Sequence, residues 1–156
     1  MPYPSKTILA FPSQTVNPAG SPYLSSKIII VENYTAAIIR LTTGALTGTT
    51  SPTLNCYIQQ GMRVPVASDT ALQDVQGLDA NIVWNDFGSL TQVVASSANI
   101  WASVVGGGSV VGAAKDGTLT AGFANGPLGS LWRVKIVVGG TNVSWATVQV
   151  VIQLIP

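Results

Sequence analysis

The sequence predicts an all-β fold: an antiparallel β-sandwich of about eight strands that follows an extended N-terminal arm. Three observations predict it. Short runs alternate apolar with polar residues, Gly- and Ser-rich turns separate these runs, and no stretch sustains the 3.6-residue period of a helix. Since 156 residues fit one domain, we assign residues 1–26 to the arm and residues 27–156 to the sandwich.

The N-terminal arm is set apart by its prolines, which lack a backbone donor and exclude both a helix and a central strand. Its prolines and aromatic residues are Pro2, Tyr3, Pro4, Phe11, Pro12, Pro18, Pro22 and Tyr23. Three interpretations are open: the arm lies along its own domain, it extends to a neighbouring subunit, or it is disordered. For the second, Tyr3, Phe11 and Tyr23 are candidate interface residues.

Several short runs in the first part of the sandwich have the composition of strands. They are Lys27–Val31, Ala36–Thr42, Thr53–Gln59, Ile82–Val94, Ile100–Val105, Val110–Lys115 and Thr118–Phe123. Asp116 and Gly117 suit a two-residue hairpin turn between the last two runs. Asp69–Leu78 is a candidate for one short helix. Cys56 lies on the apolar side of Thr53–Gln59, which predicts a buried structural thiol.

The clearest strand is Trp145–Ile155, whose even positions from Ala146 to Leu154 are all apolar. The run from Trp132 to Val138 follows the same pattern. Because the Gly-rich segment Gly139–Asn142 joins these two runs, the pattern predicts a β-hairpin. Trp145 falls on the polar side of its strand, which makes it a fourth candidate interface residue unless a loop or the arm covers it.

The other tryptophans, Trp84, Trp101 and Trp132, lie among apolar neighbours and are predicted to belong to the core. Gly106–Gly108 lacks the context of a phosphate-binding loop and is interpreted as a turn between strands. The acidic residues Asp69, Asp74, Asp79 and Asp86 do not match a calcium loop. Asp74 or Asp79 with Asp86 as the carboxylate pair of an acid-based hydrolase is the least favoured function, because roles in turns and helix caps explain these residues equally well and are commoner.

The charge content excludes several classes of function. Seven basic and six acidic side chains make up 8% of the chain, against about 25% in a typical soluble domain. The net charge of +1 provides no footprint for nucleic acid. Because the chain has no histidine, the Ser-His-Asp and Cys-His pairs are excluded, and with one cysteine no metal cage is expected. We therefore expect neither an enzyme nor a cofactor, and the neutral surface favours assembly.

The sequence also lacks the features of a membrane protein. No run approaches about 18 consecutive apolar residues, and the first residues do not have the pattern of a secretory signal. We expect a soluble protein made in a cytoplasm, without a membrane partner.

One segment resembles a known family. Gly126–Trp145, which reads GPLGSLWRVKIVVGGTNVSW, resembles the C-terminal hairpin of small β-sandwich virion proteins of tailed bacteriophages, and Thr53–Gln60 and Val83–Val93 fit the same pattern. The resemblance implies a jelly-roll-like sandwich and a role as a capsid decoration (cement) protein or another head or tail component. It implies no catalytic residues.

Two functions from different classes follow from this resemblance. The first is a structural protein on the capsid exterior, a homotrimer that binds the major capsid protein at subunit junctions and stabilises the assembled shell. The alternative is a tail-associated carbohydrate-binding module or adhesin, in which Trp84–Asp86 or Trp101 would contact sugars.

Overall fold

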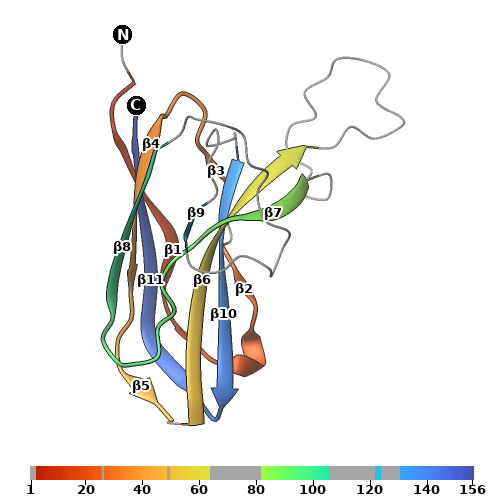
Figure 1. The fold of residues 1–156 in the computed structure, drawn as a ribbon, viewed down its shortest axis with the longest axis vertical. Helices are drawn as coiled ribbons and strands as arrows, with labels where there is room; N and C mark the ends of the chain where they lie inside the picture. The colour runs from red at the N-terminus through yellow and green to blue at the C-terminus, as the bar shows by residue number, and fades with distance from the viewer. Residues whose placement is uncertain (1–2, 26, 49, 64–81, 106–121, 124–130) are drawn as a thin grey trace.

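Strands that alternate apolar and polar residues form two antiparallel sheets, which pack face to face in the computed structural model (Figure 1). This confirms the predicted all-β sandwich. The structure describes residues 3–25, 27–48, 50–63, 82–105, 122–123 and 131–156. The predicted helix Asp69–Leu78, the turn at Gly106–Gly108 and the turn at Asp116 and Gly117 lie outside these residues.

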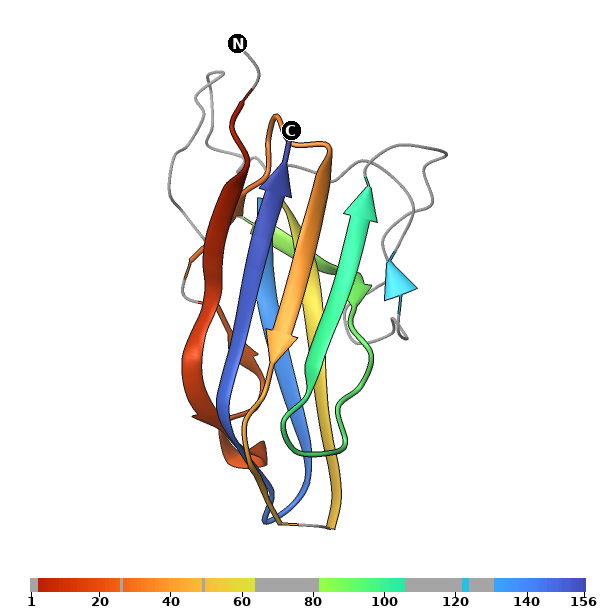
Figure 2. The same cartoon turned by 90° about the vertical axis from the view of Figure 1, so that its left-hand side faces the viewer.

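The first sheet, sheet A, has the strand order β1-β11-β4-β8, and β5 also pairs with β11 (Figure 2). Its strands are β1 (Lys6–Val16), β4 (Ala36–Thr42), β5 (Leu46–Thr47), β8 (Asn99–Val105) and β11 (Ser144–Ile155). The two edges of its main path are therefore β1 and β8, which come from distant parts of the sequence.

The second sheet, sheet B, has the order β2-β10-β6-β7-β9, and β3 also pairs with β10. Its strands are β2 (Tyr23–Leu24), β3 (Ile29–Ile30), β6 (Thr50–Arg63), β7 (Ile82–Ser89), β9 (Gly122–Phe123) and β10 (Leu131–Thr141). A short 3-10 helix, η1 (Pro18–Gly20), connects β1 to β2. Strands β10 and β6 pair along most of their lengths, so they form the centre of this sheet.

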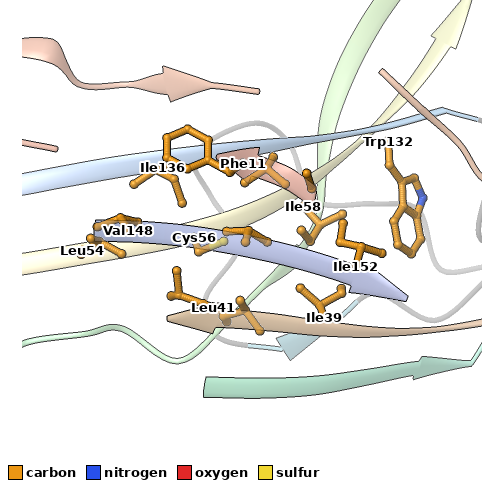
Figure 3. Close-up of a cluster of buried hydrophobic side chains, with 14 of the residues drawn as sticks. Phe11, Ile39, Leu41, Leu54, Cys56, Ile58, Trp132, Ile136, Val148 and Ile152 are labelled. Atoms are coloured by element: carbon orange, nitrogen blue, oxygen red, sulfur yellow. The ribbon is translucent and has the colours of Figure 1, made fainter. Parts of the chain in front are cut away.

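The core lies between the two sheets and consists of the apolar rows that the alternation predicts (Figure 3). Val134, Ile136 and Val138 on β10 face Val148 and the following apolar positions on β11, and all are buried. Trp132 is fully buried, and its ring lies 5.4 Å from that of Phe87. Since none of these side chains carries charge, burial of apolar surface drives the association of the sheets.

The segment from β10 to β11 differs from the predicted hairpin. Strand β10 belongs to sheet B and β11 to sheet A, so the turn at Asn142 and Val143 crosses from one sheet to the other. The hairpin prediction is wrong because two amphipathic strands can bury their apolar rows in two ways. They can pair as neighbours in one sheet, or they can belong to two sheets and face each other across the core. The backbone reverses through positive φ angles of 109° at Gly140 and 53° at Asn142.

The N-terminal segment lies along its own sandwich. Strand β1 pairs with β11 at the edge of sheet A, and β2 pairs with β10 in sheet B. Ala10, Phe11 and Val16 are buried in the core. An edge strand tolerates Pro12, because a proline there removes no hydrogen bond from the middle of a sheet.

A candidate docking face on sheet A

The outer face of sheet A carries a continuous row of side chains across all four main strands. The register places Leu9 opposite Val151, Val151 opposite Arg40, and Arg40 opposite Trp101. Leu9 is 48% exposed and Trp101 is 59% exposed. Residues that oppose each other in a sheet point to the same side, so these four side chains form one surface.

This surface extends over neighbouring rows and is almost without charge. We call it the neutral face; it comprises Thr7, Leu9, Ile38, Arg40, Asn99, Trp101, Ser103, Val105, Val151 and Gln153. Val105 has the most exposed large apolar side chain in the described part of the chain, at 76%. Arg40 is the only charged member of the set. A face of this composition can bury apolar and neutral polar surface without desolvating many charges.

Trp101 is held in position although it is exposed. The guanidinium of Arg40 lies over its ring, 5.0 Å from the ring centre. Arg40 Nε in turn donates a hydrogen bond to Asn99 Oδ1 at 3.1 Å. Because Arg40 comes from the neighbouring strand, the pair restrains the indole before any partner binds. The side chain therefore loses less conformational entropy when a partner binds.

The outer face of sheet B carries a different arrangement, a buried polar network. Lys135 Nζ on β10 lies 3.1 Å from Asp86 Oδ1 on β7. Between them on β6, Gln59 donates from Nε2 to the same oxygen at 2.9 Å and accepts from Arg133 Nε at 2.7 Å. We call Gln59, Asp86, Arg133 and Lys135 the Asp86 cluster.

The ion pair at the centre of the Asp86 cluster is buried. The side chain of Asp86 is 0% exposed and that of Lys135 is 8% exposed. The ring of Trp84 lies under Arg133, with 4.4 Å between its centre and the guanidinium carbon, and Tyr57 lies 4.8 Å from Lys135 Nζ. The carboxylate of Asp86 is thus buried and ion-paired, and the two cations of the cluster lie against aromatic rings, so removal of one partner would leave a buried charge.

The role predicted for Asp86, a turn or helix cap, is wrong, because Asp86 lies within β7 and pairs with Lys135. The sequence contained only part of this signal. Lys135 and Arg133 stand on the polar side of their strand, but Asp86 lies 49 residues from Lys135 in sequence, and Gln59 lies 74 residues from Arg133. The other members of the predicted acidic group, Asp69, Asp74 and Asp79, lie outside the described residues.

Two of the four predicted interface residues belong to the core. Phe11 is 1% exposed and Trp145 is 0% exposed, so neither side chain is available to a partner on the surface of this chain. Trp145 turns inward because of a β-bulge: β1 advances from Gln14 to Val16 while its partner on β11 advances from Val148 to Trp145. Thr147, the extra residue, has a φ of 49°.

The other two interface candidates remain outside the core. Tyr3 is 55% exposed, and nothing in the register places it on the neutral face. Tyr23 is half-buried, and its hydroxyl accepts a hydrogen bond from the backbone N–H of Asn17 at 3.1 Å. This contact fixes the connection between β1 and β2, so the structure gives Tyr23 a role within the chain.

The tryptophans divide differently from the prediction. Trp132 is in the core as expected, but Trp101 is exposed and Trp84 is half-buried on an outer face. The alternation of apolar and polar residues in β8 could have placed Trp101 outside the core, because Trp101 shares its side of the strand with Asn99 and Ser103. The apolar residues Ile100, Ala102 and Val104 occupy the opposite side.

Three further features concern the reactivity of the cysteine, metal binding and membrane spans. Burial raises the pKa of the Cys56 thiol from 9.0 to about 12, so the thiol is unreactive at neutral pH. Within the described ranges, no group of three or more histidine, cysteine, aspartate or glutamate residues could hold a metal ion. None of the helical segments among these residues has the length and hydropathy of a membrane span.

Comparison with known proteins gives no assignment: no family model, curated protein or solved structure matches this chain.

Proposed function

We propose that this protein is a structural virion protein of a tailed bacteriophage, which decorates the capsid and binds the major capsid protein through the neutral face. The observation that carries the proposal is the neutral face itself, an exposed sheet surface with one charged residue, Arg40. The resemblance of Gly126–Trp145 to phage virion proteins supports the same class.

The mechanism follows from where such a face binds. A protein that binds the assembled shell and not the free subunits stabilises the shell by mass action. A stable interface buries about 800 Å² on each partner, and its binding energy concentrates in a few anchors, often tryptophan and arginine. Trp101, restrained by Arg40, has the chemistry of such an anchor, and the apolar side chains of Leu9, Val105 and Val151 lie on the same face.

One observation favours the second candidate function, a carbohydrate-binding module. An exposed indole beside Asn99 and Arg40 resembles the way that sugar rings are stacked and hydrogen-bonded. The wider face favours a protein partner over a sugar, because Leu9, Val105 and Val151 add apolar surface away from Trp101 that would not hydrogen-bond a sugar. We therefore place the capsid role first.

The test is co-sedimentation of purified protein with shells that lack it. Trp101→Ala is expected to lower retention on the shells by about tenfold to a hundredfold, as truncation of a tryptophan anchor in an interface does. Met62→Ser is the matched control: Met62 is 68% exposed on β6 of the other sheet, and its removal should leave retention unchanged. Equal retention of Trp101→Ala and the unmodified protein overturns the proposal, and glycan binding that Trp101→Ala abolishes favours the second candidate.

A further inference from the structure

The two edges of sheet A differ in how they are protected against pairing with another strand. Proteins protect exposed edges with charged residues, prolines and bulges. Strand β1 has all three: Lys6, Pro12 and register shifts between Leu9 and Phe11, between Phe11 and Gln14, and between Gln14 and Val16. Its outer edge is thus a poor template for a further strand.

Strand β8 has none of these protections. Its seven residues, Asn99–Val105, pair with β4 without interruption and include neither a charged residue nor a proline. Among the strands that the structure describes, β4 is its only partner. In Figure 2, β8 runs straight along the side of the sheet opposite β1. Because this edge is regular, uncharged and seven residues long, it is suited to pair with another strand.

The core is also incomplete beside β8. Ile100 and Ala102 point to the core side but are only partly buried. Their partners on β4, Leu41 and Ile39, are both 0% exposed. The apolar layer is therefore closed under β4 and at Val104 on β8 but open at Ile100 and Ala102, which a strand added to β8 would cover.

We propose that β8 pairs antiparallel with β8 of a second copy of this chain, about a two-fold axis through Ala102, which makes the chain a dimer in place of the homotrimer that the resemblance implies. In this register Ala102 faces its own counterpart, and Ile100 faces Val104 of the second copy, so apolar residues meet on the core side. On the outer side, Trp101 faces Ser103 of the second copy. The strand is thus complementary to itself, as an interface with two-fold symmetry requires.

The charges are compatible with this arrangement. Among the described residues that the register places next to β8, the charged one is Arg40 on β4, and its two copies would be separated by three strand spacings, about 14 Å. This exceeds the Debye length of about 8 Å at physiological ionic strength, so their repulsion is screened. Pairing of β8 with β1 of another copy is disfavoured, because Lys6, Pro12 and the bulges interrupt that edge.

The two-fold pair would join sheet A of both copies into one continuous sheet. Because the outer faces of the two sheets would then lie on the same side, the two neutral faces would form one wider surface. Self-association of the purified chain does not depend on the capsid role. The following experiment uses the protein alone, so its failure would leave the proposed function standing.

The first measurement is the mass in solution by light scattering over a range of concentrations. We expect the 16.1 kDa chain to approach twice its mass as concentration rises. Ala102→Lys places two like charges directly opposite each other at the axis and is expected to weaken the association by about tenfold or more. The control is Thr7→Lys on the protected β1 edge, which should not change it.

The second measurement does not depend on whether Ala102→Lys folds. Residues directly opposite in an antiparallel pair have Cα atoms about 4.5–5.5 Å apart, within the range of a disulfide. Ala102→Cys is therefore expected to give an oxidised dimer at least tenfold faster than Thr7→Cys, and the buried Cys56 adds no background. A monomeric or trimeric mass at every concentration, or equal rates for both cysteine variants, overturns the proposal.

Discussion

Each sheet of the sandwich presents a tryptophan under an arginine on its outer face, and the two pairs differ in what surrounds them. On sheet A, Arg40 lies 5.0 Å from the centre of the Trp101 ring. On sheet B, Arg133 lies 4.4 Å from the centre of the Trp84 ring. In both, the arginine and the tryptophan come from different strands, so the local chemistry is the same.

The hydrogen bonds beyond each arginine account for the difference. Arg133 donates a hydrogen bond to Gln59, which in turn donates one to Asp86 of the buried ion pair. Arg40, in contrast, donates a hydrogen bond to Asn99, which is exposed. A network that reaches a buried charge contributes to folding, because loss of one member leaves another unpaired. A pair that ends at solvent contributes little to folding and leaves its tryptophan available to a partner.

The largest change in stability is expected at the buried ion pair of Lys135 and Asp86, where the two outer faces differ most. Lys135→Met removes the cation beside Asp86 and leaves a carboxylate that is 0% exposed without it. Breaking a buried pair in this way costs about 3–5 kcal/mol of unfolding free energy. Urea unfolding followed by tryptophan fluorescence measures this difference.

The control for Lys135→Met is Lys6→Met, which removes an exposed lysine from β1. It should change the unfolding free energy by less than about 0.5 kcal/mol. If the two variants prove equally stable, the Asp86 cluster does not stabilise the fold, and the distinction between the two outer faces is lost.

Alternation along the strands predicted the two-layer fold, because it records which side of each strand faces the core. It could not predict which strands pair. The turn at Asn142 and Val143 has the residues of a hairpin but joins β10 in one sheet to β11 in the other. That choice depends on β6 and β4, which pair with β10 and β11 and lie far away in sequence.

Bulges are the second limit of prediction from alternation. Strict alternation placed Trp145 outside, but the extra residue at Thr147 shifts the strand by one position and turns the indole inward. The bulge depends on a neighbouring segment, since a Cβ on Gly44 would collide with Thr147 Oγ1. A requirement of this kind between distant residues leaves no periodic signal.

The candidate site was predictable in kind but not in position. Low charge predicted a neutral surface, and the structure contains an exposed face on sheet A with one charged residue; its use in assembly stays a proposal. Its tryptophan, Trp101, was expected in the core because its sequence neighbours are apolar. In a strand the residues two positions away share a side chain's face, and for Trp101 these are polar.

An intermediate effect is expected from a matched pair of arginine variants. Arg133→Gln removes the donor to Gln59 Oε1 and the cation over Trp84, so we expect a loss of about 1–3 kcal/mol in unfolding free energy. Arg40→Gln makes the same change at the exposed pair and should cost about 0.5 kcal/mol or less. Thermal and urea unfolding of both variants tests the comparison, and equal losses would contradict it.

The smallest effect concerns the core that both sheets share. The two outer faces act separately only if the core between them excludes water. Cys56 on β6 tests this, because burial away from water raises the pKa of its thiol from 9.0 to about 12. The folded chain then holds the thiol proton more tightly than the unfolded chain. The resulting contribution to stability is complete below pH 9.0 and declines as the pH rises from there toward about 12.

At pH 9.5 this decline amounts to about 0.8 kcal/mol, since each unit of pH well above the unfolded-state pKa costs about 1.4 kcal/mol. Cys56→Ala removes the titrating group, so the stability gap between it and the unmodified protein should narrow by that amount between pH 7 and pH 9.5. Tyrosine and lysine titration affects both proteins alike and cancels in the difference. A gap that does not change with pH would mean that water reaches Cys56, and the separation of the two outer faces by a dry core would then fail.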